Sequence, residues 1–307
     1  MWPGPGRGAL RSLLTLQSLS RKPDMEDTQS PSSTGNNPPP RPPGLRQALK
    51  QQALELAGTA LTQGALFTAR QVTQAIHQRP DANNTFFDPA AFPFTSRMER
   101  NWKVIRQELD AVMRGVEIIP NFQDLMPEQR ELTTDDRWKT FVFYGYGVKF
   151  EDNCRRCPET TRLLESIPGM TSAMFSILRG RKHIPPHSGH YKGVLRYHLG
   201  LLVPEPADAC HIRVGDKTAS WREGQSLIFD DTHEHEVRKE NDGDRVVLFV
   251  DFLRPLPPVL SGLNRTVVKL ISLSPYITRS EQNSRKWEEY FGEEFDLVRN
   301  PPSGKRA

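Results

Sequence analysis

The chain of 307 residues is long enough for one large domain or two small ones, and 36% of its residues are hydrophobic and 25% charged. Its 41 basic and 37 acidic residues leave a formal charge of only +4, too little to imply a surface built for nucleic acid, so no nucleic-acid partner is expected. Three cysteines are too few for a disulfide scaffold and no apolar run could span a bilayer, which predicts a reduced, cytoplasmic protein without an integral membrane segment.

The N-terminal third of the chain divides into a tail and a helical region. Residues 1–44 are rich in proline, glycine, serine and asparagine, which predicts a disordered tail. Its first residues are basic and lack acids, as in a transit peptide, and Met25 is an alternative start. Residues 45–120 are predicted to be helical, because apolar residues recur at three- and four-residue steps from Leu45 and again from Trp102. Both series predict packing faces.

The apolar pattern changes from a helical to a strand-like period after a short helix that is predicted to begin at Pro158 and to end at Gly169. The expected strands cover residues 173–178, 194–203, 211–214, 226–230 and 245–253. Their rhythm predicts a mostly β fold with flanking helices, built on a barrel or jelly roll. Residues 259–307 are expected to form a C-terminal helical extension.

Histidines gather in the strand-rich region, where seven of the eight lie between His183 and His235. Because histidine is the commonest metal ligand, the cluster predicts a metal site. His183 and His187 have the spacing of a zincin pair, but that pair needs a helix, and Pro185 and Pro186 exclude one. A metal site in this region must therefore be built on strands.

Strand alternation places charged side chains on faces that look buried. Arg196 and His198 share one face of the strand 194–203. Arg245 shares a face with apolar residues of the strand 245–253. Burying a cation is costly unless an anion or a metal complex lies beside it, so we expect an anionic partner for Arg245.

Six segments then stand in the order known from one protein family: Met174–Leu178, Pro186–Gly189, Leu195–Leu201, Leu227–Asp231, Glu234–Val237 and Asp244–Asp251. On these motifs the chain resembles the aspartyl/asparaginyl β-hydroxylases, which are oxygenases that use Fe(II), 2-oxoglutarate and O2. The resemblance implies a double-stranded β-helix core of the jelly-roll or cupin-like type over residues 121–258. It also implies β-hydroxylation of Asp or Asn in a peptide or protein substrate.

The resemblance implies a role for six residues. His187 and His235 would be the catalytic iron ligands, Ser176 and Arg245 would hold the distal carboxylate of 2-oxoglutarate, and Arg196 and His198 would contact its other end near the metal. In most of the wider superfamily a ligand carboxylate stands two residues after the first histidine, and here that position is Gly189, as in the β-hydroxylases. A halide in that place, as in related halogenases, is an alternative.

Other interpretations stay open. Relatives in the family hydroxylate an acyl chain of lipid A, and the stretch 264–277, with Arg265 and Lys269 among apolar residues, either lies on a membrane surface or packs on the barrel. A non-catalytic metal-binding jelly roll is a further alternative. Cys154 and Cys157 either form a redox-active pair, with thiol pKa values lowered by the intervening arginines, or pack in a turn.

Overall fold

The computed structural model describes residue 64, residues 66–273 and residues 275–299, and these belong to one unit, Leu61–Ala307. The predicted tail of residues 1–44, the alternative start at Met25 and the helical series from Leu45 lie outside the described residues. No helix in the described ranges is long and apolar enough to cross a membrane.

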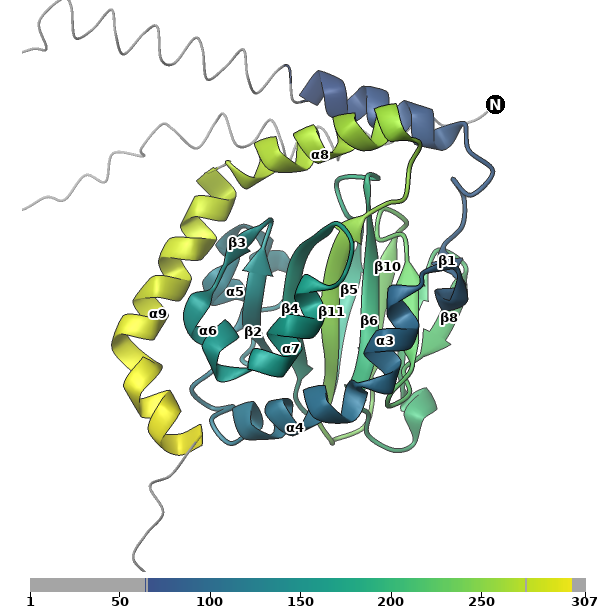
Figure 1. The fold of residues 1–307 in the computed structure, drawn as a ribbon. Helices are drawn as coiled ribbons and strands as arrows, with labels where there is room; N and C mark the ends of the chain where they lie inside the picture. The colour runs from purple at the N-terminus through teal and green to yellow at the C-terminus, as the bar shows by residue number, and fades with distance from the viewer. Residues whose placement is uncertain (1–63, 65, 274, 300–307) are drawn as a thin grey trace, which may run out of the picture. The chain divides into compact units, whose positions relative to one another are not determined.

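Two antiparallel sheets form the centre of this unit (Figure 1). The larger sheet has the order β1 (Phe86–Phe87), β9 (Ser226–Phe229), β6 (Val194–Leu202), β11 (Arg245–Leu253), β4 (Met170–Leu178), β2 (Trp138–Gly145) and β3 (Val148–Lys149). The smaller sheet has the order β5 (Lys182–His187), β10 (His235–Lys239), β7 (Cys210–Val214) and β8 (Lys217–Ser220). Strands distant in sequence are neighbours in both sheets, as in a jelly roll. The predicted mostly β fold with a double-stranded β-helix core is confirmed.

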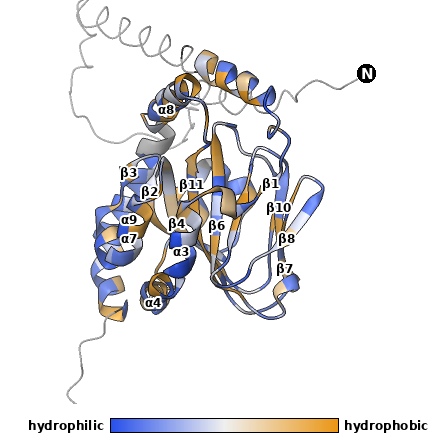
Figure 2. Cartoon of the chain, turned by 45° about the vertical axis from the view of Figure 1, so that its right-hand side comes forward, coloured by the Kyte–Doolittle hydropathy of each residue, from blue (hydrophilic) through white to orange (hydrophobic). Residues whose placement is uncertain are grey.

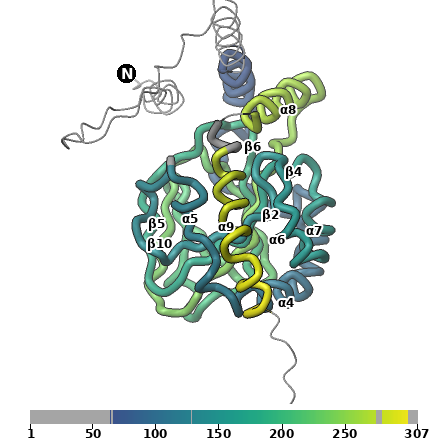
Figure 3. Tube along the Cα trace, turned by 90° about the vertical axis from the view of Figure 1, so that its left-hand side faces the viewer, coloured from purple at the N-terminus to yellow at the C-terminus, as the bar shows by residue number. Residues whose placement is uncertain are grey.

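Helices precede, cover and follow the barrel. Residues 66–77 are helical, and the later elements are η1 (Pro89–Ala91), α3 (Phe94–Arg100), α4 (Trp102–Met113), α5 (Phe122–Leu125), η2 (Pro127–Leu132), α6 (Glu151–Arg156), α7 (Pro158–Glu165), η3 (Ala207–Ala209), α8 (Pro258–Ser272) and α9 (Pro275–Arg299). The long helix α9 crosses the side of the molecule next to α5 and β2 (Figure 3). The Trp287 indole of α9 donates a hydrogen bond to the carbonyl of Ile118, which fixes the helix there.

Apolar side chains pack in two layers, one on each face of the larger sheet. On the outer face, Leu199 and Leu248 belong to the same cluster as Ile105 and Leu109 of α4, so the packing face predicted from Trp102 onward is confirmed. The inner layer lies between the two sheets and includes Trp138, Leu178, Ile184, Ile212, Trp221, Phe229 and Val247. In Figure 2 the central strands of the larger sheet, such as β4 and β11, carry more of the hydrophobic colour than α3 or the strands β7 and β8. In each strand, the residues on one face therefore point into the space between the two sheets.

The sequence pattern does not predict β2. All but the last residue of Trp138–Gly145 are buried, so the segment shows no alternation of apolar and polar residues from which a strand could be read. The helix predicted at Pro158 is confirmed as α7. Pro185 and Pro186 lie in the strand β5, which agrees with the exclusion of a helical zinc site.

Cys154 lies in α6 and Cys157 directly follows it; both are buried, and burial raises the pKa of both thiols. The expectation that the intervening arginines leave these pKa values lowered is wrong, because burial outweighs the lowering effect of Arg156 on Cys157, and the Arg156 guanidinium is paired with the carboxylates of Glu288 and Asp296 at 2.7 and 2.8 Å. Protonated, buried thiols are poor nucleophiles, so the contacts favour a packed turn over a redox pair.

Candidate functional site

Two histidines face each other where β5 ends and β10 begins. His187 and His235 are opposite one another in the antiparallel ladder, and their ring centroids lie 4.1 Å apart. In each ring Nδ1 is bonded to a backbone carbonyl, that of Pro185 at 2.8 Å and that of His233 at 3.0 Å. A carbonyl only accepts, so Nδ1 carries the hydrogen and Nε2 keeps its lone pair for a metal ion.

Both imidazoles are held in the neutral form that binds metals. Burial lowers the pKa of His187, and burial together with the nearby His187 lowers the pKa of His235 to about 3. Across the described residues, no group of three or more His, Cys, Asp or Glu side chains could hold a metal ion. A metal bound by this pair would therefore take its other ligands from solvent or from a bound small molecule.

Gly189 follows the first histidine at the place where other oxygenases have a ligand carboxylate, and Asp231 fills the space that its side chain would need. A Cβ at Gly189 would lie 2.4 Å from Oδ2 of Asp231. The Gly189 amide also donates to the Asp231 carbonyl at 2.7 Å. Burial raises the pKa of Asp231 to about 6, although an ion pair with Arg196 at 2.9 Å opposes the shift. No sequence motif predicts a role for Asp231, and its place in the acidic pair Asp230–Asp231 after an apolar strand is the signal that could have indicated one.

Arg245 is a buried cation without a carboxylate partner among the described residues. Its exposed fraction is 2%, and burial lowers its pKa. The guanidinium lies 4.4 Å from the Trp221 ring centroid and donates to the Ser176 carbonyl at 3.3 Å, while Nε has no hydrogen-bond partner among the described residues. The expected anionic partner is therefore not found in the described part of the chain. A bound carboxylate would supply it.

Ser176 and His198 both lie beside this arginine, whereas the resemblance places only Ser176 with it and His198 at the other end of the co-substrate. The Trp138 indole donates to Oγ of Ser176 at 3.1 Å, and the Trp221 indole donates to Nδ1 of His198 at 3.2 Å. Because Nδ1 accepts, Nε2 of His198 carries the hydrogen, and this buried donor has no partner in the described ranges. Burial and the charge of Arg245 hold the pKa of His198 well below its usual range. Arg245 and His198 thus present two unpaired donors to the interior.

Arg196 differs from Arg245 because its charge is already paired. Its guanidinium contacts Asp231 at 2.9 Å and Asp251 at 2.8 Å and lies 4.3 Å from the Phe249 ring centroid. A direct contact between Arg196 and a co-substrate stays a prediction. Its present contacts position the Asp231 carboxylate next to the histidine pair.

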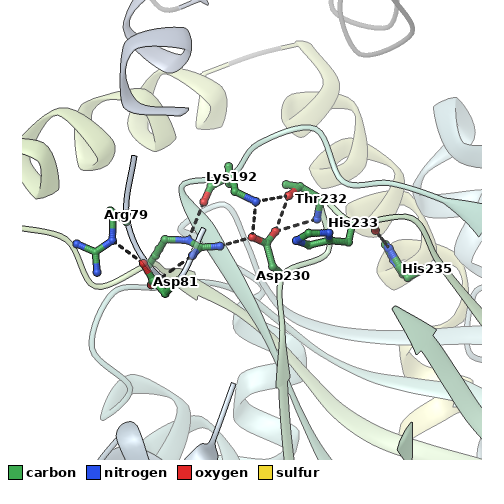
Figure 4. A network of polar contacts seen from close by, with 8 residues as sticks. Arg79, Asp81, Lys192, Asp230, Thr232, His233 and His235 are labelled. Atoms are coloured by element: carbon green, nitrogen blue, oxygen red, sulfur yellow. Dashed lines mark hydrogen bonds and ion pairs between the residues drawn. The ribbon is translucent and has the colours of Figure 1, made fainter. Parts of the chain in front are cut away.

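An ion network joins the loop that follows His187 to the loop that precedes His235 (Figure 4). Asp230, which is fully buried, accepts hydrogen bonds from Lys192 at 2.8 Å and from Arg254. Arg254 also donates from Nε to the Lys192 carbonyl at 3.0 Å and contacts Asp81 at 3.7 Å. Lys192 lies in the loop after β5, and Asp230 lies between β9 and β10. The network therefore fixes the two loops next to the histidine pair relative to each other.

The chain is similar in sequence to several known proteins. A family model described as "Aspartyl/Asparaginyl beta-hydroxylase" matches residues 99–255, which include all six residues given roles above. An "Ornithine lipid ester-linked acyl 2-hydroxylase" from Rhizobium tropici is 44% identical over 220 residues, covering 72% of this chain and 78% of that protein. The "Aspartyl/asparaginyl beta-hydroxylase" of Homo sapiens is 36% identical over 163 residues, covering 52% of this chain and 21% of that protein. A cupin 2 barrel protein from Salinispora arenicola aligns with 45% of this chain and 91% of its own, at 6% identity and a TM-score of 0.27.

Proposed function

Because the chain belongs to the aspartyl/asparaginyl β-hydroxylase family, we propose that it is an Fe(II)- and 2-oxoglutarate-dependent hydroxylase of a lipid acyl chain. The reaction would insert oxygen at carbon 2, next to an ester carbonyl. The similarity to the Rhizobium tropici lipid hydroxylase supports this substrate class, because it extends over 78% of that protein. The similarity to the human peptide hydroxylase is lower and is limited to 21% of its length.

The unpaired guanidinium of Arg245 is the observation that carries the co-substrate proposal. A bare metal-binding barrel has no use for a buried cation that lacks an anion, whereas 2-oxoglutarate has a distal carboxylate that would pair with it. The Nε2 hydrogen of His198 would meet the other end of the same molecule. These two donors argue against a non-catalytic jelly roll.

The chain's own residues would provide binding, orientation and a dry site. His187 and His235 would hold Fe(II) through Nε2, because their Nδ1 atoms are fixed by backbone carbonyls. When bound, Fe(II) and 2-oxoglutarate would supply the oxidation, in which 2-oxoglutarate is converted to succinate and CO2. One atom of O2 enters succinate, and the other enters a C–H bond of the substrate. Asp231, held by Arg196, has one carboxylate oxygen without a partner among the described residues, and this oxygen would accept a hydrogen bond from a group bound in the site. The buried aromatic residues Trp221 and Phe229 exclude bulk water from the interior.

Hydroxylation of Asp or Asn in a peptide is the second candidate, and the family name and the match to the human enzyme favour it. The two substrates share the metal and co-substrate chemistry and differ in what enters the mouth of the barrel. Hydroxylation of lipid A is a variant of the first candidate, since it also modifies an acyl chain.

A substrate competition would separate the candidates. The full chain would be incubated with Fe(II), 2-oxoglutarate, an ester-linked ornithine lipid and an Asp-containing peptide, and the products analysed by mass spectrometry. We expect a gain of one oxygen in the ester-linked acyl chain and an equal yield of succinate, both lost in His235→Ala. Oxygen found only in the peptide would replace the lipid proposal with the peptide one. Succinate production that neither substrate increases would contradict both.

A further inference from the structure

Helix α8 has one buried face and one exposed apolar face. Asn264, Val267 and Val268 are buried against the rest of the protein. On the opposite side, Val259 is 81% exposed, and Leu273, directly after the helix, is 71% exposed. The exposed residues Val259, Leu263 and Thr266, the half-buried Leu270 and Leu273 recur at three- and four-residue steps and so form one stripe. The packing and membrane-surface alternatives for this stretch therefore describe its two different faces.

The charged residues of α8 that lie next to the exposed stripe are all basic. Arg265 and Lys269 are exposed beside it, and α8 contains no acidic residue. Neither basic side chain forms an ion pair with any Asp or Glu that the structure describes. An apolar stripe flanked by unpaired basic residues fits an anionic lipid surface, where the apolar side chains enter the interface and the charges meet head groups.

This helix lies at the end of the barrel that holds the metal-binding pair. β5 ends at His187 and β10 begins at His235, and the chain enters α8 just after the end of β11 at the same end of the barrel (Figure 1). Asn264 of α8 donates to the Gly193 carbonyl at 2.7 Å and accepts from the Tyr191 hydroxyl at 2.7 Å. Both partners belong to the loop that follows His187. The position of α8 is therefore coupled to a loop of the site.

A cavity of about 340 Å³ opens between α8 and the β2–β3 turn. Met170, Leu253 and Val268 give it apolar walls, and Arg265, Lys269 and Tyr146 also line it. Tyr146 has a φ of 49° and is the only residue other than glycine with a positive φ among those described. Burial and the carboxylates of Asp251 and Asp231 raise its phenol pKa, whereas Arg196 lowers it. Tyr146 is thus a residue of the cavity lining that interacts electrostatically with the Asp231–Arg196 pair.

We propose that the outer face of α8 docks on the surface of an anionic lipid bilayer, so that the acyl chain of a lipid in that bilayer reaches the cavity beside Tyr146 and then the metal site. The route of the acyl chain rests on the proposed function. The docking itself rests on the exposed stripe, its basic border and its place at the site end of the barrel.

Vesicle flotation of the full chain tests the docking without turnover. Vesicles would contain phosphatidylcholine alone or with phosphatidylglycerol. We expect binding to the anionic vesicles, an at least tenfold weaker partition for Val259→Asn/Leu273→Asn, and an about 30-fold weaker partition for Arg265→Gln/Lys269→Gln. The second value follows because each basic residue near an anionic surface strengthens the partition into the vesicles by slightly more than about fivefold, so two residues together strengthen it about 30-fold. All four positions are exposed, so the thermal unfolding temperature should not change and a loss of folding would be detected separately.

Helix α9 provides matched controls. Tyr290 and Leu297 are 73% and 62% exposed, so Tyr290→Asn/Leu297→Asn removes a similar apolar surface, and Arg285→Gln/Lys286→Gln removes two exposed charges. These variants should bind vesicles within about twofold of the unmodified chain. Equal losses in the α8 and α9 variants would overturn the proposal, as would absence of binding to anionic vesicles. Self-association through α8 without vesicle binding would also overturn it and would mark a protein interface. Vesicle binding through α8 without lipid hydroxylation would support the docking and refute the substrate.

Discussion

Replacing Arg245 with methionine should make the ligand-free protein more stable while abolishing its response to 2-oxoglutarate. A buried ion costs several kcal/mol in lost hydration. Arg245 recovers part of this from the Trp221 ring at 4.4 Å, worth about 2 kcal/mol, and from a bond to the Ser176 carbonyl at 3.3 Å, worth roughly 1.5 to 3 kcal/mol. A hydrogen bond with the neutral Cys210 thiol adds a smaller contribution. Since no described carboxylate completes the pairing, we expect Arg245→Met to raise the free energy of unfolding by about 1 kcal/mol.

The same substitution at Arg196 should have the opposite effect. Arg196 is held by Asp231 and Asp251, so Arg196→Met leaves two buried carboxylates without their cation. Breaking such a buried pair costs about 3 to 5 kcal/mol. The two variants therefore compare the effect of the same Arg→Met substitution on stability at a position with carboxylate partners and at a position without them in the described part of the chain.

Thermal unfolding with and without 2-oxoglutarate and Mn(II) measures both effects. At a 2-oxoglutarate concentration of about 100 times its Kd, the unmodified chain should gain about 2.7 kcal/mol of stability, and Arg245→Met should gain none. Each kcal/mol corresponds to roughly 2 to 4 °C for a protein of this size. If Arg245→Met destabilised the ligand-free protein as much as Arg196→Met, or kept its response to 2-oxoglutarate, the view of Arg245 as an unpaired co-substrate anchor would be refuted.

Three further predictions concern the histidine pair and its surroundings. Burial holds the pKa of His235 near 3, below its usual 6.5, so the unfolded chain binds more protons than the folded chain at acidic pH. The ligand-free protein should therefore lose stability as the pH falls below about 6.5. His235→Gln should reduce that loss, as measured by urea denaturation at several pH values. Gly189→Ala should lower the free energy of unfolding by about 1 to 3 kcal/mol, because its Cβ would meet the Asp231 carboxylate, and an unchanged urea midpoint would contradict this. Cys157 should resist a thiol reagent in the folded protein and react once urea unfolds it, since burial raises its pKa, and rapid labelling of the native protein would restore the redox interpretation.

The alternation of side chains along the expected strands predicts much of the fold and part of the site. Alternation alone placed Arg196 and His198 on one inward face, and the ladder between β6 and β11 agrees with that placement. Only the family resemblance paired His187 with His235, because 48 residues separate them in sequence and their contact depends on sheet pairing. Local patterns carry no information on such distant contacts.

What the sequence did not predict depends on three-dimensional packing. The Asp231 carboxylate occupies space that is free because Gly189 has no side chain. The position of Tyr146 depends on its left-handed backbone conformation at the β2–β3 turn. Neither property has a local sequence pattern. The stretch 264–277 favours two competing interpretations because α8, which contains its residues 264–272, has both a packing face and an exposed face, and the burial of Asn264, Val267 and Val268 identifies the packing face.

An anaerobic titration of the metal-free chain with Fe(II) and then 2-oxoglutarate tests the central claim most directly, because only a chelated complex gives a visible charge-transfer band. We predict a band for the unmodified chain and none for His187→Ala. A folded, unmodified chain that shows no band, or a band that persists in His187→Ala, would contradict the assignment of this site to iron and 2-oxoglutarate.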